Sequence, residues 1–246
     1  MNSPFPETRR PKILSLLDFV ARARNSTGVH VEKLDQAECF LLYKVAGIQY
    51  LRRRIRGVAP HIWVLELPRN PDGSINLSWG RHNIETKFQL RLAFDNYLAS
   101  ALSVWDATWQ LLNVAFQLNE SIDDGRLADK TIAALRKLAV GRSTGLERYV
   151  QLKGDSASWL SELREARNAA THRDLLDFRA RVDLRVQDLP KQQVLAIVGV
   201  QHPGGRTERL DLFLDRTTRE TIALLEYTFM QLAQRFDDMA RRKESC

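Results

Sequence analysis

The feature that most constrains the fold of this chain is a ladder of large apolar residues between positions 84 and 119. Its members recur every three or four residues, which is the spacing that places side chains on one face of an α-helix. Aromatic residues at this density are typical of a helix buried in a core, because each ring removes a large apolar area from water. The ladder consists of Leu90, Phe94, Tyr97, Leu98, Ala101, Leu102, Trp105, Trp109, Leu112 and Phe116.

Similar helical spacing predicts further helices on both sides of this ladder, and two stretches alternate apolar and polar residues as strands do. One of these stretches surrounds the turn sequence Pro71-Asp72-Gly73, and the other includes Leu210, Leu212 and Leu214 as its last strand. We therefore predict a mainly α protein with two small antiparallel β insertions. The predicted parts are an extended arm over 1–11 and one domain over 12–246, with N-terminal helices in 12–56, a β hairpin at 61–79, core helices in 84–175, a β insertion at 178–214 and a C-terminal helix at 216–241.

Composition and charge narrow the class of protein. The chain has 246 residues, of which 44% are hydrophobic, so a sizeable core is expected. Its net charge is +7, mostly from Arg, which favours polyanionic partners and in particular RNA, because the guanidinium group binds phosphate and stacks on bases. No apolar run approaches the roughly 18 residues of a membrane span, and no signal peptide is evident. We expect a cytoplasmic protein without a membrane partner.

One short motif carries the functional prediction. Arg167, Asn168 and His172 lie within residues 156–173, which are predicted to be helical. On a helix Asn168 and His172 share a face, Arg164 extends that face by one turn, and Arg167 lies about 100° round from Asn168. Apolar residues adjoin this stripe, so it borders solvent, a cleft or an interface. They are Trp159, Leu160, Leu163, Ala166 and Ala170.

The motif resembles the signature of the HEPN superfamily, in which an Arg, often followed by a polar residue, precedes a His by four to six intervening residues. The resemblance covers the motif helix, the long helix before it and the final helix. It implies a helical bundle and, in many members, a metal-independent endoribonuclease. The pairs Arg24…His30 and Arg56…His61 fit the bare spacing as well, but the second crosses Gly57 and Pro60.

The resemblance implies catalytic roles for Arg167, Asn168 and His172. The ribose 2′-OH of RNA would be the nucleophile, a His can transfer its proton, and an Arg can stabilise the charge of the transition state. A homodimer would bring two motif helices into one composite site. Asp95 or Asp106 on the preceding helix would support the motif by pairing with an Arg such as Arg164, although both could instead face water.

Three Arg residues follow the motif in the alternating strand predicted over Phe178–Val186. Arg179, Arg181 and Arg185 would form either an RNA-binding strip or a charged edge that discourages strand pairing. The five His residues are scattered without ligand spacing, so no metal and no cofactor are expected.

The leading hypothesis is therefore a dimeric endoribonuclease that cleaves RNA by transesterification, as a toxin or antiviral defence effector, with an antitoxin or regulatory protein as a possible partner. The second hypothesis is a non-catalytic HEPN-like module that binds RNA, nucleotide or protein. The third is a protein–protein adaptor in which the motif is incidental.

Overall fold

The computed structural model describes residues 13–26, 29–59, 84–120, 127–137, 144–170, 176–182, 194–202 and 205–244. Within these residues the chain is mainly helical, with seven α-helices and one small antiparallel sheet, which confirms the predicted fold class. The arm predicted over 1–11 and the hairpin predicted at 61–79 lie outside the described residues.

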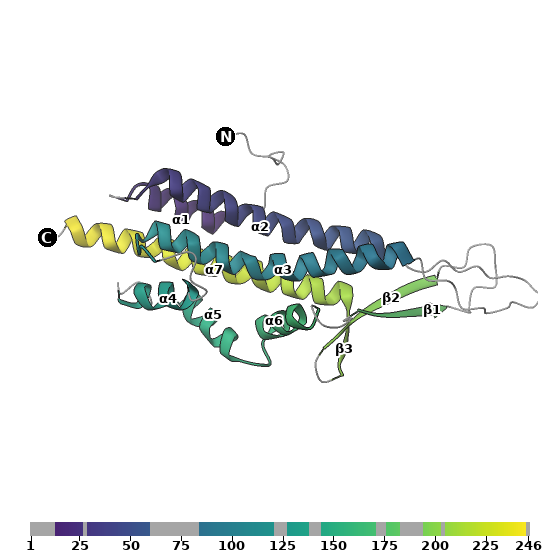
Figure 1. Cartoon of the computed structure of the whole chain (residues 1–246). Helices are drawn as coiled ribbons and strands as arrows, with labels where there is room; N and C mark the ends of the chain where they lie inside the picture. Colours follow the sequence, from purple (N-terminus) through teal and green to yellow (C-terminus); the bar gives the residue numbers. More distant parts are fainter. Residues whose placement is uncertain are drawn as a thin grey trace, which may run out of the picture. The chain divides into compact units, whose positions relative to one another are not determined.

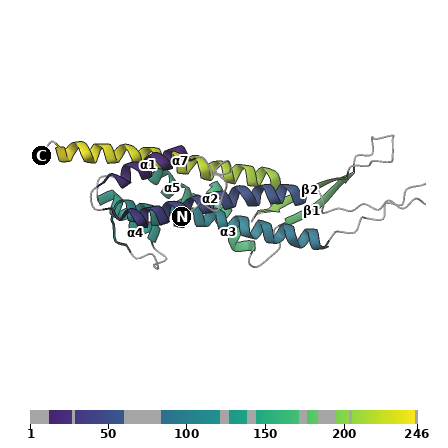
Figure 2. The same cartoon turned by 90° about the horizontal axis from the view of Figure 1, so that it is seen from above.

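The elements follow one another along the chain as the colours of Figure 1 show, and Figure 2 gives a second view. Three helices are much longer than the others, with 28, 32 and 35 residues in α2, α3 and α7. In order, the elements are α1 Leu14–Arg24, α2 Val31–Val58, α3 Ile84–Ala115, α4 Leu127–Lys137, α5 Thr144–Gly154, α6 Trp159–Ala170, β1 Leu176–Val182, β2 Val194–Gln201, β3 Thr207–Arg209 and α7 Leu210–Glu244.

The chain divides into two compact units that are interleaved in sequence. Unit 1 comprises Met1–Gln49, Ala99–Arg164 and Thr217–Cys246, and unit 2 comprises Tyr50–Leu98 and Glu165–Arg216. Each of the three long helices contributes residues to both units, as α6 does. Neither unit is therefore a separate stretch of chain.

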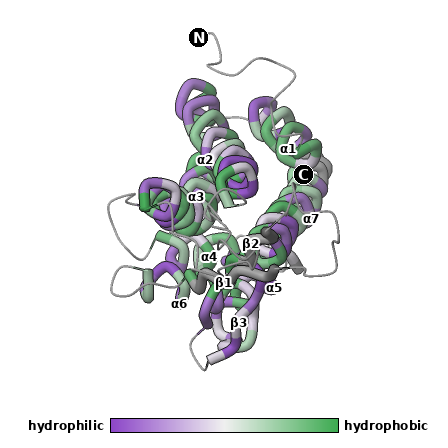
Figure 3. Tube along the Cα trace, turned by 90° about the vertical axis from the view of Figure 1, so that its right-hand side faces the viewer, coloured by the Kyte–Doolittle hydropathy of each residue, from purple (hydrophilic) through white to green (hydrophobic). Residues whose placement is uncertain are grey.

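The predicted aromatic ladder is the buried face of α3. All its members are buried except Leu102, which is partly buried. In unit 1, Tyr149 of α5 packs against two of them, with ring centroids 4.7 Å from Trp105 and 4.9 Å from Trp109. In Figure 3 the long helices carry both hydrophilic residues (purple) and hydrophobic residues (green), as amphipathic helices do.

A second aromatic cluster in unit 1 joins the first helix to the last. Phe19 of α1 lies 5.1 Å from Phe229 and 5.4 Å from Phe236 of α7, measured between ring centroids. Glu226 of α7 supplies the N-terminal cap that α1 lacks from its own residues. The backbone N–H groups of Leu14 and Ser15 donate to its two carboxylate oxygens at 3.0 and 3.1 Å, and Ser15 Oγ also donates to it. Since a carboxylate favours the positive end of the helix dipole, this contact orients α1 on α7.

The α3 helix ends in a Schellman motif. The N–H of Leu118 donates to the carbonyl of Asn113, and the N–H of Gln117 donates to that of Val114. This turn requires a left-handed backbone, and Gln117 adopts it with φ 54° although Gly is the usual residue there. The Asn113 side chain then fixes the following segment through two hydrogen bonds with the backbone of Glu120.

In unit 2 the sheet has the order β1-β2-β3, and both pairs of strands are antiparallel. In backbone register Phe178 pairs with Val198 and Leu176 pairs with Val200, and both valines are buried. Elsewhere in the unit, Phe94 of α3 packs edge-on against Phe213 of α7 at 5.9 Å between ring centroids. The Tyr97 hydroxyl donates to the carbonyl of Leu214 at 3.2 Å.

The predicted third strand is wrong in position. Leu210, Leu212 and Leu214 belong to α7, and β3 is confined to Thr207–Arg209. The buried residues here are Leu210, Phe213, Leu214 and Thr217, which are three or four apart, whereas Leu212 is 52% exposed. The packing surface in this segment therefore has a helical period, and three alternating leucines were too few to distinguish it from a strand.

Candidate functional site

The motif helix α6 begins at a well-defined cap. Ser158 precedes its first residue, and Ser158 Oγ accepts the backbone N–H of Ser161 at 3.2 Å while donating to the carbonyl of Leu152 at 2.5 Å. Asp155 accepts the N–H of Ala157 at 2.9 Å, which closes the turn before the cap. A Ser that binds the N–H three residues on satisfies one of the open donors of a helix start. These bonds fix where α6 begins and hence which of its residues face outward.

The outward face of α6 carries the predicted polar residues. Arg164, Arg167 and Asn168 are all exposed, whereas Leu160, Leu163 and Ala166 are buried on the opposite side. Arg167 makes no hydrogen bond or ion pair with any other described residue. Arg164 belongs to unit 1, and Arg167 and Asn168 belong to unit 2.

Part of the predicted site lies outside the described residues. The last residue of α6 is Ala170, and His172 lies in the segment 171–175 that the structure does not describe, so its place relative to Asn168 stays a prediction. Arg185 is also outside the described residues. In the backbone register of the sheet, Arg179 pairs with Ile197 and Arg181 pairs with Leu195.

The two supporting carboxylates lie on the outside of α3. Asp95 and Asp106 are exposed, yet the surrounding protein removes enough water to raise the pKa of each, while Arg91 and Lys44 respectively act in the opposite direction. Within unit 2, Asp95 makes no ion pair with Arg167 in the described residues. The expected brace between this helix and the motif stays a prediction.

Arg164 acts on an aromatic residue that sequence reasoning missed. Burial raises the pKa of Tyr149, and a hydrogen bond with Trp109 and the charge of Arg164 lower it in part. Asp106 raises it further. Arg164 and Asp106 thus both lie near the Tyr149 phenol in unit 1, although the two make no ion pair with each other among the described side chains. No sequence spacing connects these three residues.

The competing match Arg24…His30 has a different setting. Asn25 follows Arg24, so this match contains the same three residue types as the motif. However, α1 ends at Arg24, whose guanidinium lies 2.8 Å from both Asp35 and Glu38 of α2. Arg24 therefore has a structural partner, whereas Arg167 has none among the described residues. This contrast makes His30, which is exposed, a useful control position.

A partly buried charged cluster in unit 2 was also missed. Glu208 of β3 accepts hydrogen bonds from Arg216 at 2.6 and 3.2 Å, and its Oε2 lies 3.2 Å from Nε2 of the buried His202. Burial alone would raise the pKa of Glu208. The hydrogen bond from Arg216 and the positive charges of Arg216, His202 and Arg206 have the opposite effect, and the pKa is lowered overall. The cluster connects the β2–β3 turn to the first turns of α7. Its members are close in sequence but belong to a turn, a strand and a helix, so no single period relates them.

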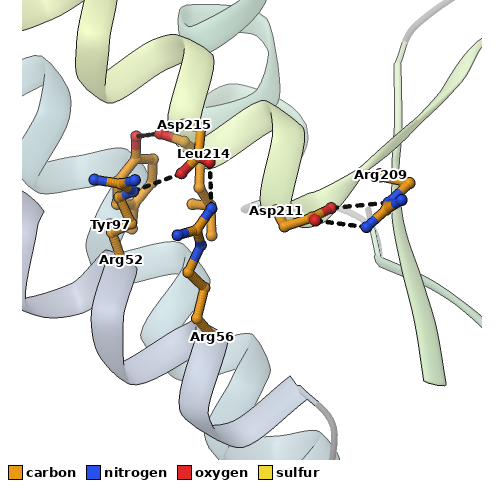
Figure 4. Close-up of polar contacts among 7 residues, drawn as sticks. All are labelled: Arg52, Arg56, Tyr97, Arg209, Asp211, Leu214 and Asp215. Atoms are coloured by element: carbon orange, nitrogen blue, oxygen red, sulfur yellow. Dashed lines mark hydrogen bonds and ion pairs between the residues drawn. The ribbon is translucent and has the colours of Figure 1, made fainter. Parts of the chain in front are cut away.

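Four arginines lie close together near the end of α2, in the basic run Arg52–Arg56. Two of them form ion pairs with α7 within unit 2. Arg52 Nε donates to Oδ1 of Asp215 at 2.6 Å, and Arg56 donates to Oδ2 of the same carboxylate (Figure 4). Nearby, Arg209 and Asp211 form a two-point ion pair at 2.6 and 3.1 Å. One carboxylate of α7 thus anchors both arginines of one α2 face.

Two surface hollows are described, and both lie in unit 1. One has a volume of about 500 Å³ and is bordered by α5 and α7 residues such as Arg148 and Tyr227. The other, of about 410 Å³, lies beside His30, Lys33 and Asn113. Neither of these two hollows is lined by Arg164, Arg167 or Asn168, although Trp159 of α6 borders the first.

Within the described part of the chain, no helix is long and apolar enough to cross a membrane, and no three His, Cys, Asp or Glu side chains gather as metal ligands would. Comparisons with family models, curated proteins and solved structures find no match to this chain.

Proposed function

We propose that this protein is a metal-independent endoribonuclease of HEPN type. The observation that carries the proposal is the exposed end of α6, where Arg167 and Asn168 face outward in a mainly helical chain, two residues before the end of the helix. Arg167 is not occupied by an acidic partner among the described residues, so it is available to a phosphate group. The net charge of +7 would favour the approach of RNA.

The proposed reaction needs few groups. His172 removes the proton of a ribose 2′-OH, the 2′-oxygen forms a bond to the adjacent phosphorus, and the bond from phosphorus to the 5′-oxygen breaks. A protonated His then gives a proton to the leaving 5′-oxygen. The products are a 2′,3′-cyclic phosphate and a 5′-hydroxyl. Arg167 stabilises the negative charge of the transition state, and Asn168 orients the His.

The proposed active unit is a homodimer in which two copies of Arg167, Asn168 and His172 share one cleft. A single Arg–His pair offers one proton-transfer group, whereas the reaction needs a base and an acid at opposite sides of the phosphorus. Two copies supply both. The proposed role is that of a toxin or antiviral effector, with an antitoxin or regulatory protein as the partner that restrains it.

The test is RNA cleavage in the presence of EDTA by wild type, Arg167→Ala, His172→Ala and the control His30→Ala. We expect wild type and His30→Ala to produce cyclic-phosphate ends. The two motif variants should each lose at least about 100-fold in rate, His172→Ala because a proton-transfer group is removed and Arg167→Ala because the transition-state charge is no longer stabilised. Equal residual activity in wild type and His172→Ala would refute the assignment. Salt-sensitive RNA binding without any cleavage would favour the non-catalytic binding module.

A mixing experiment tests the shared cleft. In this proposal a dimer of one wild-type chain and one His172→Ala chain retains a single His172, so its cleft has only one of the two proton-transfer groups that the reaction needs. Co-expression with two different tags allows the mixed dimer to be purified. We expect this mixed dimer to cleave RNA at least about 100-fold more slowly than the wild-type dimer. About half of the wild-type rate would show that each chain acts alone and would contradict the shared cleft.

A further inference from the structure

The basic run at the end of α2 separates into two pairs with different surroundings. Arg52 and Arg56 are four residues apart, lie on one face of the helix and are both bound to Asp215 (Figure 4). Arg53 and Arg54 are exposed and make no hydrogen bond or ion pair with any described residue. Successive residues are about 100° apart around a helix, so these two are rotated away from the anchored face.

Helix capping does not explain the second pair. Basic residues stabilise the negative end of a helix within its last turn, and in α2 only Arg56 lies there. Arg53 and Arg54 lie one turn earlier. The two guanidinium groups therefore keep an uncompensated positive charge at the surface of unit 2, where they contribute nothing to capping and have no acidic partner among the described residues.

An aromatic residue lies beside these two cations. Tyr50 is 62% exposed, and it precedes Arg53 by three and Arg54 by four residues. Residues at these spacings are direct neighbours on a helix surface, with Cβ atoms about 5–6 Å apart. Tyr50, Arg53 and Arg54 therefore belong to one patch of the α2 surface within unit 2, which offers an exposed ring and two guanidinium groups to a ligand.

We propose that this patch binds single-stranded RNA, with one base stacked on Tyr50 and the adjacent phosphates held by Arg53 and Arg54. Exposed aromatic rings combined with unpaired cations are the arrangement by which proteins bind single strands without sequence preference. A duplex fits less well, because its bases are already stacked. An acidic protein would use the two charges but has no need of the ring. The choice of RNA rests on the proposed function, and the patch supplies substrate binding apart from the reacting groups.

The test is fluorescence anisotropy of a short labelled oligouridine in the His172→Ala background, so that cleavage does not consume the probe. Tyr50→Ala is expected to weaken binding roughly tenfold, and Tyr50→Phe to retain it, since stacking needs the ring and not the hydroxyl. Arg53→Ala/Arg54→Ala is expected to weaken binding and to reduce the salt slope by about 1.4, which is two phosphate contacts at about 0.7 each. All three residues are exposed, so thermal unfolding should be unchanged.

The matched control is Arg136→Ala/Lys137→Ala. These two cations are also adjacent and exposed at the end of a helix, α4, and they make no hydrogen bond or ion pair within the described residues. The control lowers the net charge by the same amount as Arg53→Ala/Arg54→Ala but leaves the patch intact. RNA binding by the control variant should therefore be nearly unaffected if the patch itself binds the RNA. If the two double variants lost RNA affinity equally, net charge alone would explain the weaker binding, and the proposal would be overturned. Failure of wild type to bind the probe at low salt would overturn it too.

Two further outcomes separate the alternatives. If duplex RNA or polyglutamate competes as well as the oligouridine and Tyr50→Ala has no effect, the patch is a site for an acidic partner and the proposal is refuted. If the patch binds RNA as described but wild type never cleaves it, the binding inference stands and the proposed nuclease function fails.

Discussion

A close approach of α5 to α7 in unit 1 gives the sharpest prediction about stability. Gly145 is the second residue of α5, and a Cβ atom placed there would lie 2.7 Å from Oγ1 and 2.8 Å from Cα of Thr228 in α7. The Thr228 hydroxyl donates to the carbonyl of Leu224 at 2.7 Å, which holds the side chain in place. Part of the contact is with backbone, so Gly145→Ala cannot be accommodated by a side-chain rotation alone.

The magnitude follows from two opposing effects. Forcing a methyl group into a packed contact costs about 1–3 kcal/mol. Ala favours helix over Gly by at most about 1 kcal/mol, and by less at a helix start. The net expectation for Gly145→Ala is a loss of about 1–2 kcal/mol in the free energy of unfolding. For a chain of this size that corresponds to a fall in Tm of about 2–8 °C.

The assay is thermal and urea unfolding of Gly145→Ala beside Gly47→Ala. Gly47 lies inside α2, and a Cβ there would meet no atom within 4 Å. Gly47→Ala should therefore raise the free energy of unfolding by up to about 1 kcal/mol. Adding Thr228→Ala to Gly145→Ala should restore only part of the loss, because the contact with Cα remains. An increase in stability for Gly145→Ala similar to that of Gly47→Ala would refute the close packing of α5 on α7.

Two other predictions concern the ends of elements. Because the pKa of Glu208 is below its ordinary value of 4.5, its ion pairs should stabilise the fold fully above that pH and lose this contribution as the pH falls through the folded-state pKa. Glu208→Gln should cost about 2 kcal/mol in urea unfolding at pH 7, and the difference from wild type should shrink in acid. Gln117→Gly should stabilise the left-handed end of α3 by up to about 1 kcal/mol, and Asn119→Gly, at φ 56°, should gain less because Asn tolerates this region better. A pH-independent cost for Glu208→Gln, or a loss for Gln117→Gly, would contradict these explanations.

The sequence was informative wherever one periodic pattern extended over many residues. The aromatic ladder predicted α3, and the structure confirms the helix and its buried face, although the helix ends at Ala115 rather than near 119. The alternation at 210–214 extended over only five residues and led to the wrong element. Long patterns average over local exceptions, whereas a short one fits both the strand and the helix period.

For the candidate site, the sequence placed Arg164 and Asn168 on one polar face of α6, because the apolar residues define the other face. It left open whether this polar face borders solvent, a cleft or an interface, and the structure shows both side chains exposed. It could not identify Tyr149 as the aromatic residue near Arg164, since the two belong to different helices. It also gives no basis for dividing the basic run Arg52–Arg56 into an anchored pair and an open pair. Arginines in such a run take different roles only because each one contacts different residues in the folded protein.

The sequence by itself determined the mainly helical class, the buried face of α3 and the shared helix face of Arg164 and Asn168, because each depends on periodicity within one segment. Only the tertiary structure decided which arginines of α2 are anchored and which are open to a ligand. That distinction depends on Asp215, which lies more than 150 residues further along the chain and reaches Arg52 and Arg56 but not Arg53 or Arg54. Ion pairs between distant segments leave no periodic signal in the sequence, so the patch of Tyr50, Arg53 and Arg54 emerges only when the pairing is known.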